Sequence, residues 1–356
     1  MGTPGLVLIA AFALANPPAS PEIVRTDHMI AGDPGIRLYV REVRRRSPPS
    51  KGAPLVLLHG ARVPGVASFD LKVPGGSLAE DFAAAGHPTF IMDARGYGRS
   101  TRPPEMSEPP EAHPPLVHSD EVVRDVAAVV DWIRKRTGAA RVDLLGWATG
   151  GHWLGNYTAL HPDRVEHLVL HNTLYAGSSV HPLLGHGTDL EDPEHPGKFN
   201  VRAFGAYRWT TAASTLGAWD RSIPVVDKSL WRDPAVADAY VEAALDSDPA
   251  GRTRNPPAFR APSGAMEDSF ALAIGRPLWD ASRIRAAVLV TASERDFWSR
   301  PEDRERLERD LIHAKRVRVV VIPNATHHVH LDRPDRGRRM FLETVLVFLE
   351  DREPAP

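Results

Sequence analysis

The chain has 356 residues, with 43 lysines and arginines against 45 aspartates and glutamates, so its formal net charge is −2 at neutral pH. This balance leaves no basic surface of the kind that nucleic-acid-binding proteins use, and we expect no nucleic-acid partner. The sequence has no cysteine, which excludes disulfides and thiolate metal sites. Its 42% hydrophobic and 25% charged residues are typical of a globular protein, and the length suits one large domain, with or without an insertion.

Residues 1–22 form an N-terminal apolar segment that resembles the remnant of a secretion signal. The run from Leu6 to Ala15 ends in an A-x-A sequence, the form of a signal cleavage site. No lysine or arginine precedes the run, and it is too short to span a bilayer. The sequence therefore leaves a secreted or periplasmic location and a cytoplasmic location as alternatives, and predicts no membrane span.

Strands and helices alternate along the first half of the chain. Residues 54–58 and 89–92 are continuous apolar runs, as expected for parallel strands that are buried on both faces. Helical spacing between them predicts a helix that ends at Gly86, and a second helix is predicted from Ser119, its expected N-cap, to Gly138. Further strands are predicted at residues 36–40, 141–145 and 167–170.

The alternation stops at residues 178–280 and then resumes. Strands are predicted at 287–291 and 317–322, with helices at about 301–314 and 338–350. The intervening segment contains aromatic residues among prolines but no strong buried strand, and a structureless loop of that length is improbable. The pattern predicts an α/β fold, with a core of residues 23–177 and 281–356 and an inserted helical cap at 178–280 over the functional edge of a mainly parallel sheet.

The most informative motif follows the predicted strand at 141–145. The sequence Gly-Trp-Ala-Thr-Gly-Gly at residues 146–151 stands between that strand and a segment with helical spacing. This is the strand–turn–helix context of the G-x-S-x-G nucleophile elbow, in which a sharp turn lifts a nucleophile above the sheet. Ala148 occupies the nucleophile position. The alternative is a glycine-rich turn without chemistry.

With four other motifs in order, the chain resembles the α/β-hydrolase superfamily over residues 36–177 and 277–350. Each motif follows a predicted strand, which makes the set more specific than any one of them. The other four are His59-Gly60-Ala61, the sequence DARGYGRS at 93–100, Asp296, and His327 followed by His330-Leu331-Asp332-Arg333-Pro334. The resemblance implies the α/β-hydrolase fold, a mainly parallel sheet flanked by helices.

The resemblance also implies catalytic roles. His327 is the expected general base, with His328 and His330 as rivals, and Asp296 is expected to orient it, with Glu294 as the rival. The oxyanion hole would consist of backbone N–H groups, one from Thr149 and the other from the loop at Ala61 or Arg62. The acid–histidine–elbow order explains one histidine without a metal, so neither a metal ion nor another cofactor is expected.

Several side chains near these motifs are candidates for substrate binding. They are Arg62, which could reach an anionic group, together with Trp147, His152, Trp298 and His328. Surface exposure for Arg62 and ordinary packing for the others are the alternatives.

Ala148 has no lone pair, so it cannot attack a carbonyl carbon. We interpret the chain as a carboxylic-ester hydrolase with a Ser-His-Asp triad for a small or medium organic ester, inactivated by alanine at the nucleophile position. The alternatives are a natural non-hydrolytic binding protein, an acyltransferase, or a parent with aspartate at 148, as in epoxide hydrolases and dehalogenases. The expected partner is the small-molecule ester, and the sequence leaves the oligomeric state open.

Overall fold

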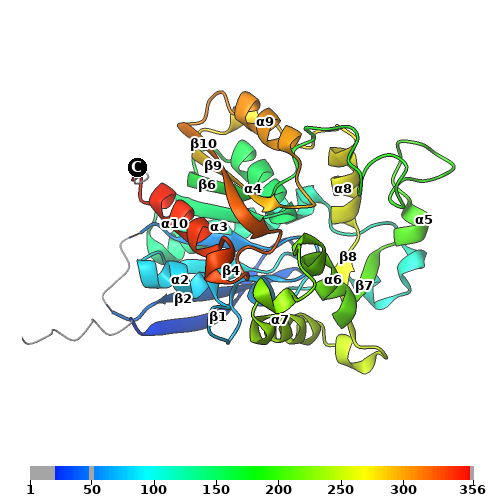
Figure 1. Cartoon of the computed structure of the whole chain (residues 1–356), viewed down its shortest axis with the longest axis horizontal. Helices are drawn as coiled ribbons and strands as arrows, with labels where there is room; N and C mark the ends of the chain where they lie inside the picture. The colour runs from blue at the N-terminus through cyan, green and yellow to red at the C-terminus, as the bar shows by residue number, and fades with distance from the viewer. Residues whose placement is uncertain (1–20, 48–51, 353–356) are drawn as a thin grey trace, which may run out of the picture.

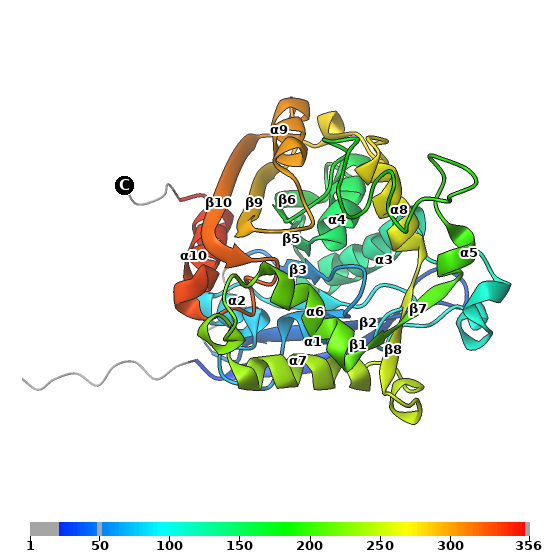
Figure 2. The same ribbon diagram turned by 45° about the vertical axis from the view of Figure 1, so that its right-hand side comes forward.

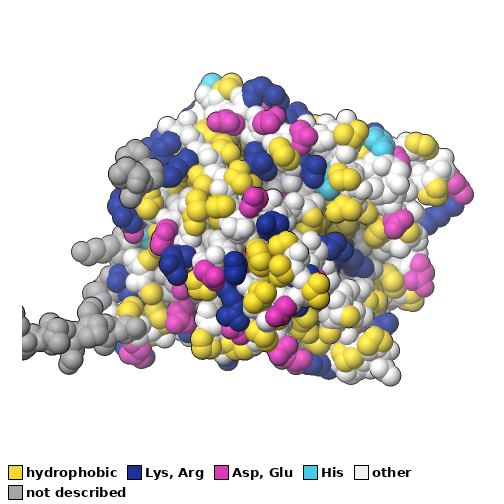
Figure 3. All heavy atoms as spheres, in the orientation of Figure 1, with side chains coloured by type: hydrophobic (Ala, Val, Ile, Leu, Met, Phe, Trp, Pro, Cys, Tyr) yellow, Lys and Arg dark blue, Asp and Glu magenta, His cyan; other side chains and the backbone are white. Residues whose placement is uncertain are grey.

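The computed structural model describes residues 21–47 and 52–352 (Figure 1). The signal-like run at Leu6 to Ala15 lies outside the described residues. Within them, no helix is long and apolar enough to cross a membrane. Figure 3 shows hydrophobic, acidic and basic side chains interspersed over one face of the molecule.

An eight-stranded sheet forms the centre of the molecule. Its order is β1 (Ile23–Ala31), β2 (Arg37–Arg45), β4 (Thr89–Met92), β3 (Leu55–Leu58), β5 (Val142–Trp147), β6 (Val165–His171), β9 (Ala287–Arg295) and β10 (Arg316–Thr326). Strand β2 is antiparallel to both of its neighbours, and the strands from β4 to β10 are parallel. The predicted mainly parallel sheet is therefore confirmed, and the antiparallel β1 is an addition that the sequence did not suggest.

Helices cover both faces of this sheet (Figure 1). Helices α3 (Ser119–Thr137), α4 (Thr149–Leu160) and α9 (Pro301–Asp310) pack on one face, and α2 (Leu78–Ala85) and α10 (Arg338–Leu349) pack on the other. Side chains alternate along β3. Val56 and Leu58 pack in the hydrophobic core with α3, α4 and α9, and Leu55 and Leu57 pack in the core on the other face, with α2 and α10. The short helix α1 (Gly65–Phe69) follows β3.

The helix ends explain where the predicted boundaries hold and where they fail. Gly86 and Gly138 end α2 and α3 in the left-handed conformation, with φ of 109° and 75°. The prediction that Ser119 caps α3 is wrong, because Ser119 is already helical and His118 is the N-cap. The backbone N–H of Ser119 instead donates to Asp268 at 2.7 Å. The free N–H group at the start of α3 is therefore paired with a side chain 149 positions away in the sequence. The local sequence around Ser119 gives no sign of this contact.

The segment between β6 and β9 contains more than helices. Helices α5 (Val201–Phe204), α6 (Ala212–Ser222), α7 (Pro234–Asp246) and α8 (Gly264–Ala273) are joined by strands β7 (Tyr207–Thr211) and β8 (Ala258–Pro262). These two strands form an antiparallel sheet, so the inserted segment contains a two-stranded sheet besides the helices that the sequence predicted. The sequence YRWTT of β7 is only partly buried and has no continuous apolar run, which explains why it was missed.

The inserted segment packs against the rest of the chain through its own hydrophobic core. Figure 2 shows α6, α7, β7 and β8 grouped on one side of the sheet. Trp219, Tyr240 and Phe259 from these elements pack in one cluster with Val63 and Leu331. We retain the division into a core (23–177 and 281–356) and a cap (178–280) as a proposal. Short 3-10 helices complete the described elements, at Pro104–Ser107, Pro110–Ala112, Lys228–Leu230, Gly251–Thr253, Ala281–Arg283 and Pro334–Arg336.

Candidate active site

The turn between β5 and α4 holds Ala148 in a strained conformation. Its φ of 53° and ψ of −117° lie where residues with a Cβ are rarely found, and such strain costs on the order of 1–3 kcal/mol. The backbone N–H of Ala148 donates to the carbonyl of His171 at 2.8 Å. Gly150 permits close approach of the helix to the preceding loop, since a Cβ there would stand 2.5 Å from the carbonyl oxygen of His59. The elbow geometry is therefore present, with a methyl group at its apex.

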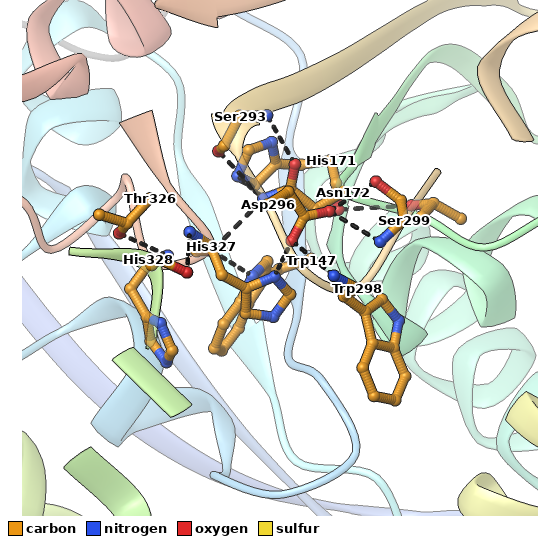
Figure 4. A network of polar contacts seen from close by, with 12 residues as sticks. Trp147, His171, Asn172, Ser293, Asp296, Trp298, Ser299, Thr326, His327 and His328 are labelled. Carbon is orange, nitrogen blue, oxygen red and sulfur yellow. Dashed lines mark hydrogen bonds and ion pairs between the residues drawn. The ribbon is translucent and has the colours of Figure 1, made fainter. Parts of the chain in front are cut away.

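His327 and Asp296 form a direct pair beside this turn. The Nδ1–H of His327 donates to Asp296 Oδ1 at 2.6 Å (Figure 4). Asp296 also accepts hydrogen bonds from the backbone N–H groups of Trp298 and Ser299 and from the Ser299 hydroxyl, at 3.0, 2.8 and 2.6 Å. Burial raises the pKa of Asp296, but the charge of His327 and these hydrogen bonds outweigh it, so the pKa lies below its usual value. The ionised carboxylate can therefore accept the Nδ1–H of His327 and hold the orientation of its ring.

The rival acid Glu294 accepts a hydrogen bond from the backbone N–H of Asn324 at 2.6 Å and is exposed. The structure therefore brings Asp296, and not Glu294, to the ring of His327.

The loop that carries His327 is fixed by residues from two strand ends. Its backbone carbonyl accepts hydrogen bonds from the indole of Trp147 at 2.9 Å and from the side chain of Asn172 at 3.4 Å (Figure 4). Asn172 has a φ of 51°, and its amide oxygen accepts the N–H of Ser293 at 2.8 Å. Asn172 therefore connects the ends of β6 and β9 to this loop. Sequence reasoning missed it, although an asparagine directly after a buried strand was a usable signal.

The two rival histidines lie close to His327, but no carboxylate pairs with either ring among the described residues. Burial lowers the pKa of both His328 and His330 well below the usual value, which keeps both rings neutral. The ring of His328 stacks on Trp219 with centroids 5.1 Å apart. Within the described part of the chain, neither ring nitrogen of His330 has a hydrogen-bond partner. Their environments do not pair them with a carboxylate as His327 is paired.

A cavity of about 470 Å³ opens above the elbow. Its walls include most of the residues selected from the sequence, namely Ala61, Arg62, Trp147, Ala148, Thr149, Trp298, His327 and His328. His152 is not among them, and the prediction that it contacts substrate is therefore unsupported. Its Nδ1 accepts a hydrogen bond from the indole of Trp279 at 3.0 Å, and burial lowers its pKa to about 4. The ring of His152 therefore lies on the buried side of α4, where it packs against Trp279.

Sequence reasoning did not identify the side chains that line most of the cavity wall. They come mainly from the inserted segment, and they are Leu183, Leu184, Asp189, Leu190, Arg208, Thr215, Ala218, Arg221, Tyr240 and Met266, with Val63 and Phe297 from the core. No local pattern distinguishes an aromatic or arginine that faces a cavity from one that packs within a small domain. Among the described residues, no group of three or more His, Cys, Asp or Glu side chains is arranged to hold a metal ion.

A strained strand–helix turn, a histidine–carboxylate pair beside it and a cavity above it define a hydrolase-type site on a mainly parallel sheet. A family model described as "alpha/beta hydrolase fold" matches residues 53–334. The chain belongs to the α/β-hydrolase fold family.

Two relatives in sequence indicate the range of this family. The human (Lyso)-N-acylphosphatidylethanolamine lipase is 26% identical over 290 residues, which cover 79% of this chain and 75% of that protein. The 1-acylglycerol-3-phosphate O-acyltransferase ABHD5 of Sus scrofa is 32% identical over 162 residues, 44% of this chain and 38% of that protein.

Solved structures show the same fold at lower identity. An E-2-(acetamidomethylene)succinate hydrolase matches 92% of this chain and 100% of its own, with a TM-score of 0.58 and 18% identity. A thermophilic esterase from Thermogutta terrifontis matches 92% of this chain and 98% of its own, with a TM-score of 0.55 and 17% identity. A serine-to-alanine mutant of the meta-cleavage product hydrolase of Pseudomonas fluorescens IP01 matches 91% of this chain and 97% of its own, with a TM-score of 0.56 and 16% identity.

Proposed function

We propose that this site is built for hydrolysis of a carboxylic ester of a small or medium organic compound, with a serine at position 148 in the catalytically complete form. With Ala148, the chain binds such an ester without turning it over. The observation that carries this proposal is the His327–Asp296 pair at 2.6 Å, beside the strained elbow at the floor of a cavity. A lipase and an esterase among the similar proteins agree with the proposal.

The proposed mechanism assigns a separate task to each group. A serine hydroxyl at 148 would attack the ester carbonyl while the Nε2 of His327 takes its proton, and the ionised Asp296 would stabilise the resulting imidazolium. The backbone N–H groups of Thr149 and Ala61 would donate to the oxyanion, and one such donor contributes about 3–4 kcal/mol in related chemistry. The same imidazolium would then protonate the leaving alcohol, and water would release the acid by the reverse steps.

The acyltransferase named among the similar proteins keeps transfer to an alcohol as a second candidate. Both reactions share the acyl-enzyme and differ only in whether water or an alcohol removes the acyl group. Product partitioning with added glycerol distinguishes them, since a transferase forms the glyceryl ester in preference to the free acid.

The decisive experiment restores the missing oxygen. We expect Ala148→Ser to raise kcat on p-nitrophenyl esters by about 10⁶-fold, the loss typical of removing such a nucleophile. The matched control is Ala148→Ser combined with His327→Gln, which keeps the hydroxyl and removes its base, and it should return the rate close to that of the Ala148 protein. A folded Ala148→Ser protein that stays inert over a broad panel of esters would overturn the proposal.

A further inference from the structure

The cavity wall carries an excess of positive charge. Arg62, Arg208 and Arg221 all line it, and Asp189 is the single carboxylate among the described residues that do so. No carboxylate in the described part of the chain forms an ion pair with any of the three guanidinium groups. Buried arginines are normally paired, because an uncompensated charge is costly to remove from water. Arg62 and Arg208 are partly buried in the cavity wall without such a partner, which indicates a missing anion, whereas Arg221 is exposed and lies over the ring of Phe297 at 5.0 Å from its centroid.

Arg208 is the best placed of the three. It lies on β7, and its Nη2 donates to the carbonyl of Ala61 at 2.8 Å, the residue whose N–H is proposed for the oxyanion hole. The hydroxyl of Tyr97 donates to the same carbonyl at 3.3 Å. The Nε and Nη1 atoms of Arg208 are buried without a hydrogen-bond partner in the described residues. Two nitrogen atoms, which carry three N–H donors, are thus left for a ligand beside the reaction centre.

Arg62 supplies a second charge at the same wall. It is partly buried, and its Nη1 donates to the carbonyl of Ser214 in α6 at 3.2 Å. Burial, and then the nearby charge of Arg62, lower the pKa of Arg208 to about 10. Burial likewise lowers the pKa of Arg62, with a further contribution from the charge of Arg221. Arg208 and Arg62 thus each lie near another positive charge, and a bound anion would offset that repulsion.

We propose that the ester substrate carries an oxyanion group, a carboxylate or a phosphate, which Arg208 and Arg62 bind a few bonds from the scissile carbonyl. The short linker follows from the contact with Ala61. Standard bond lengths allow at most about 4 Å between the N and O atoms of one residue, so Nη2 of Arg208 lies within about 7 Å of the Ala61 N–H. The inference rests on the proposed ester site for its orientation, but the anion-binding element is testable without catalysis.

The test uses the chain with Ala148, which binds without turnover, and a matched pair of ligands. Isothermal titration compares monomethyl glutarate, which is anionic, with the neutral dimethyl glutarate. We expect the anionic ligand to bind at least about 10-fold more tightly, because a hydrogen bond to a charged group contributes about 1.5–3 kcal/mol. Arg208→Gln should weaken the anionic ligand by roughly 10- to 100-fold and leave the neutral ligand unchanged.

Arg283→Gln removes an exposed arginine outside the cavity and should leave both affinities unchanged. If Arg208→Gln fails to fold, Arg62→Gln replaces it in the test. The preference for the anionic ligand over the neutral ligand should be lost in that variant too. Equal affinity for the two ligands, or a preference that survives in the folded Arg208→Gln protein, overturns the proposal. Displacement of monomethyl glutarate by inorganic phosphate assigns the site to phosphate-bearing esters, and its absence assigns it to carboxylates.

The failures of the two proposals are distinguishable. If Ala148→Ser stays inert over a broad panel of esters while the charge preference in binding persists, the ester-hydrolase proposal fails and the anion site stands. If Ala148→Ser hydrolyses the dimethyl ester as efficiently as the monomethyl ester, the anion proposal fails and the hydrolase stands.

Discussion

The close approach of α4 to the loop after β3 depends on Gly150, and its replacement by alanine tests whether that approach builds the site. A Cβ at position 150 would stand 2.5 Å from the His59 carbonyl oxygen and 2.8 Å from the Leu58 carbonyl carbon. Relief to ordinary contact distances of about 3.5 Å requires the helix start and the loop to separate by on the order of 1 Å. Overpacking costs about 1–3 kcal/mol when side chains can adjust. Since both partners are backbone, we expect a loss of about 3 kcal/mol or more.

Gly217→Ala provides the matched control for this prediction. Gly217 lies in α6, and a Cβ there meets no atom within 4 Å, so alanine should raise the free energy of unfolding by about 0.5–1 kcal/mol. Urea unfolding followed by circular dichroism measures both changes. In the Ala148→Ser background, Gly150→Ala should also lower kcat, because the N–H groups of Thr149 and Ala61 would move apart. Equal midpoints for the two alanine variants would refute the reasoning.

Two further predictions concern titratable groups. The hydrogen bond between His118 and Asp268 raises the pKa of His118 to about 9, so its stabilising contribution is present below pH about 6.5 and is lost as the pH rises through about 9. His118→Ala should therefore reduce the free energy of unfolding at pH about 6 and have little effect at pH about 10, and a constant difference in urea midpoints across that range would contradict this assignment. In the Ala148→Ser background, Asp296→Asn should lower kcat by roughly 10⁴-fold, because the amide no longer stabilises the imidazolium of His327. Single-turnover kinetics measure this loss, and a change below about 10-fold would remove Asp296 from the proposed triad.

The core of this fold was predictable because its signals are local. Continuous apolar runs such as 54–58 and 89–92 mark parallel strands, and Gly86 and Gly138 end helices by a backbone conformation that glycine adopts easily. The pairing of His327 with Asp296 was predictable for a different reason, since each follows a strand end in an order that the family shares.

The rest of the site depends on contacts that sequence spacing does not encode. Arg208 lies on a short, half-exposed strand of the inserted segment, and nothing in its neighbourhood predicts that it reaches Ala61. His152 stands close to the elbow in sequence, yet the helical turn directs it to Trp279 and away from the cavity. The side-chain amide of Asn172 forms hydrogen bonds with the backbone of Ser293 in β9 and of His327, which only the assembled sheet brings together.

The ties between the inserted segment and the core restrict how a ligand exchanges with the solvent. Asp268 binds the start of α3, Arg208 binds Ala61, and the indole of Trp219 donates to Asp332 at 2.8 Å. A hinge-like movement of the whole inserted segment would break all three hydrogen bonds together. The bond between Trp219 and Asp332 is fully buried. The half-exposed Leu183 borders the cavity at its rim, and ligand exchange there leaves all three hydrogen bonds intact. The width of the entrance, more than the volume of the cavity, would then limit how bulky a ligand the protein admits.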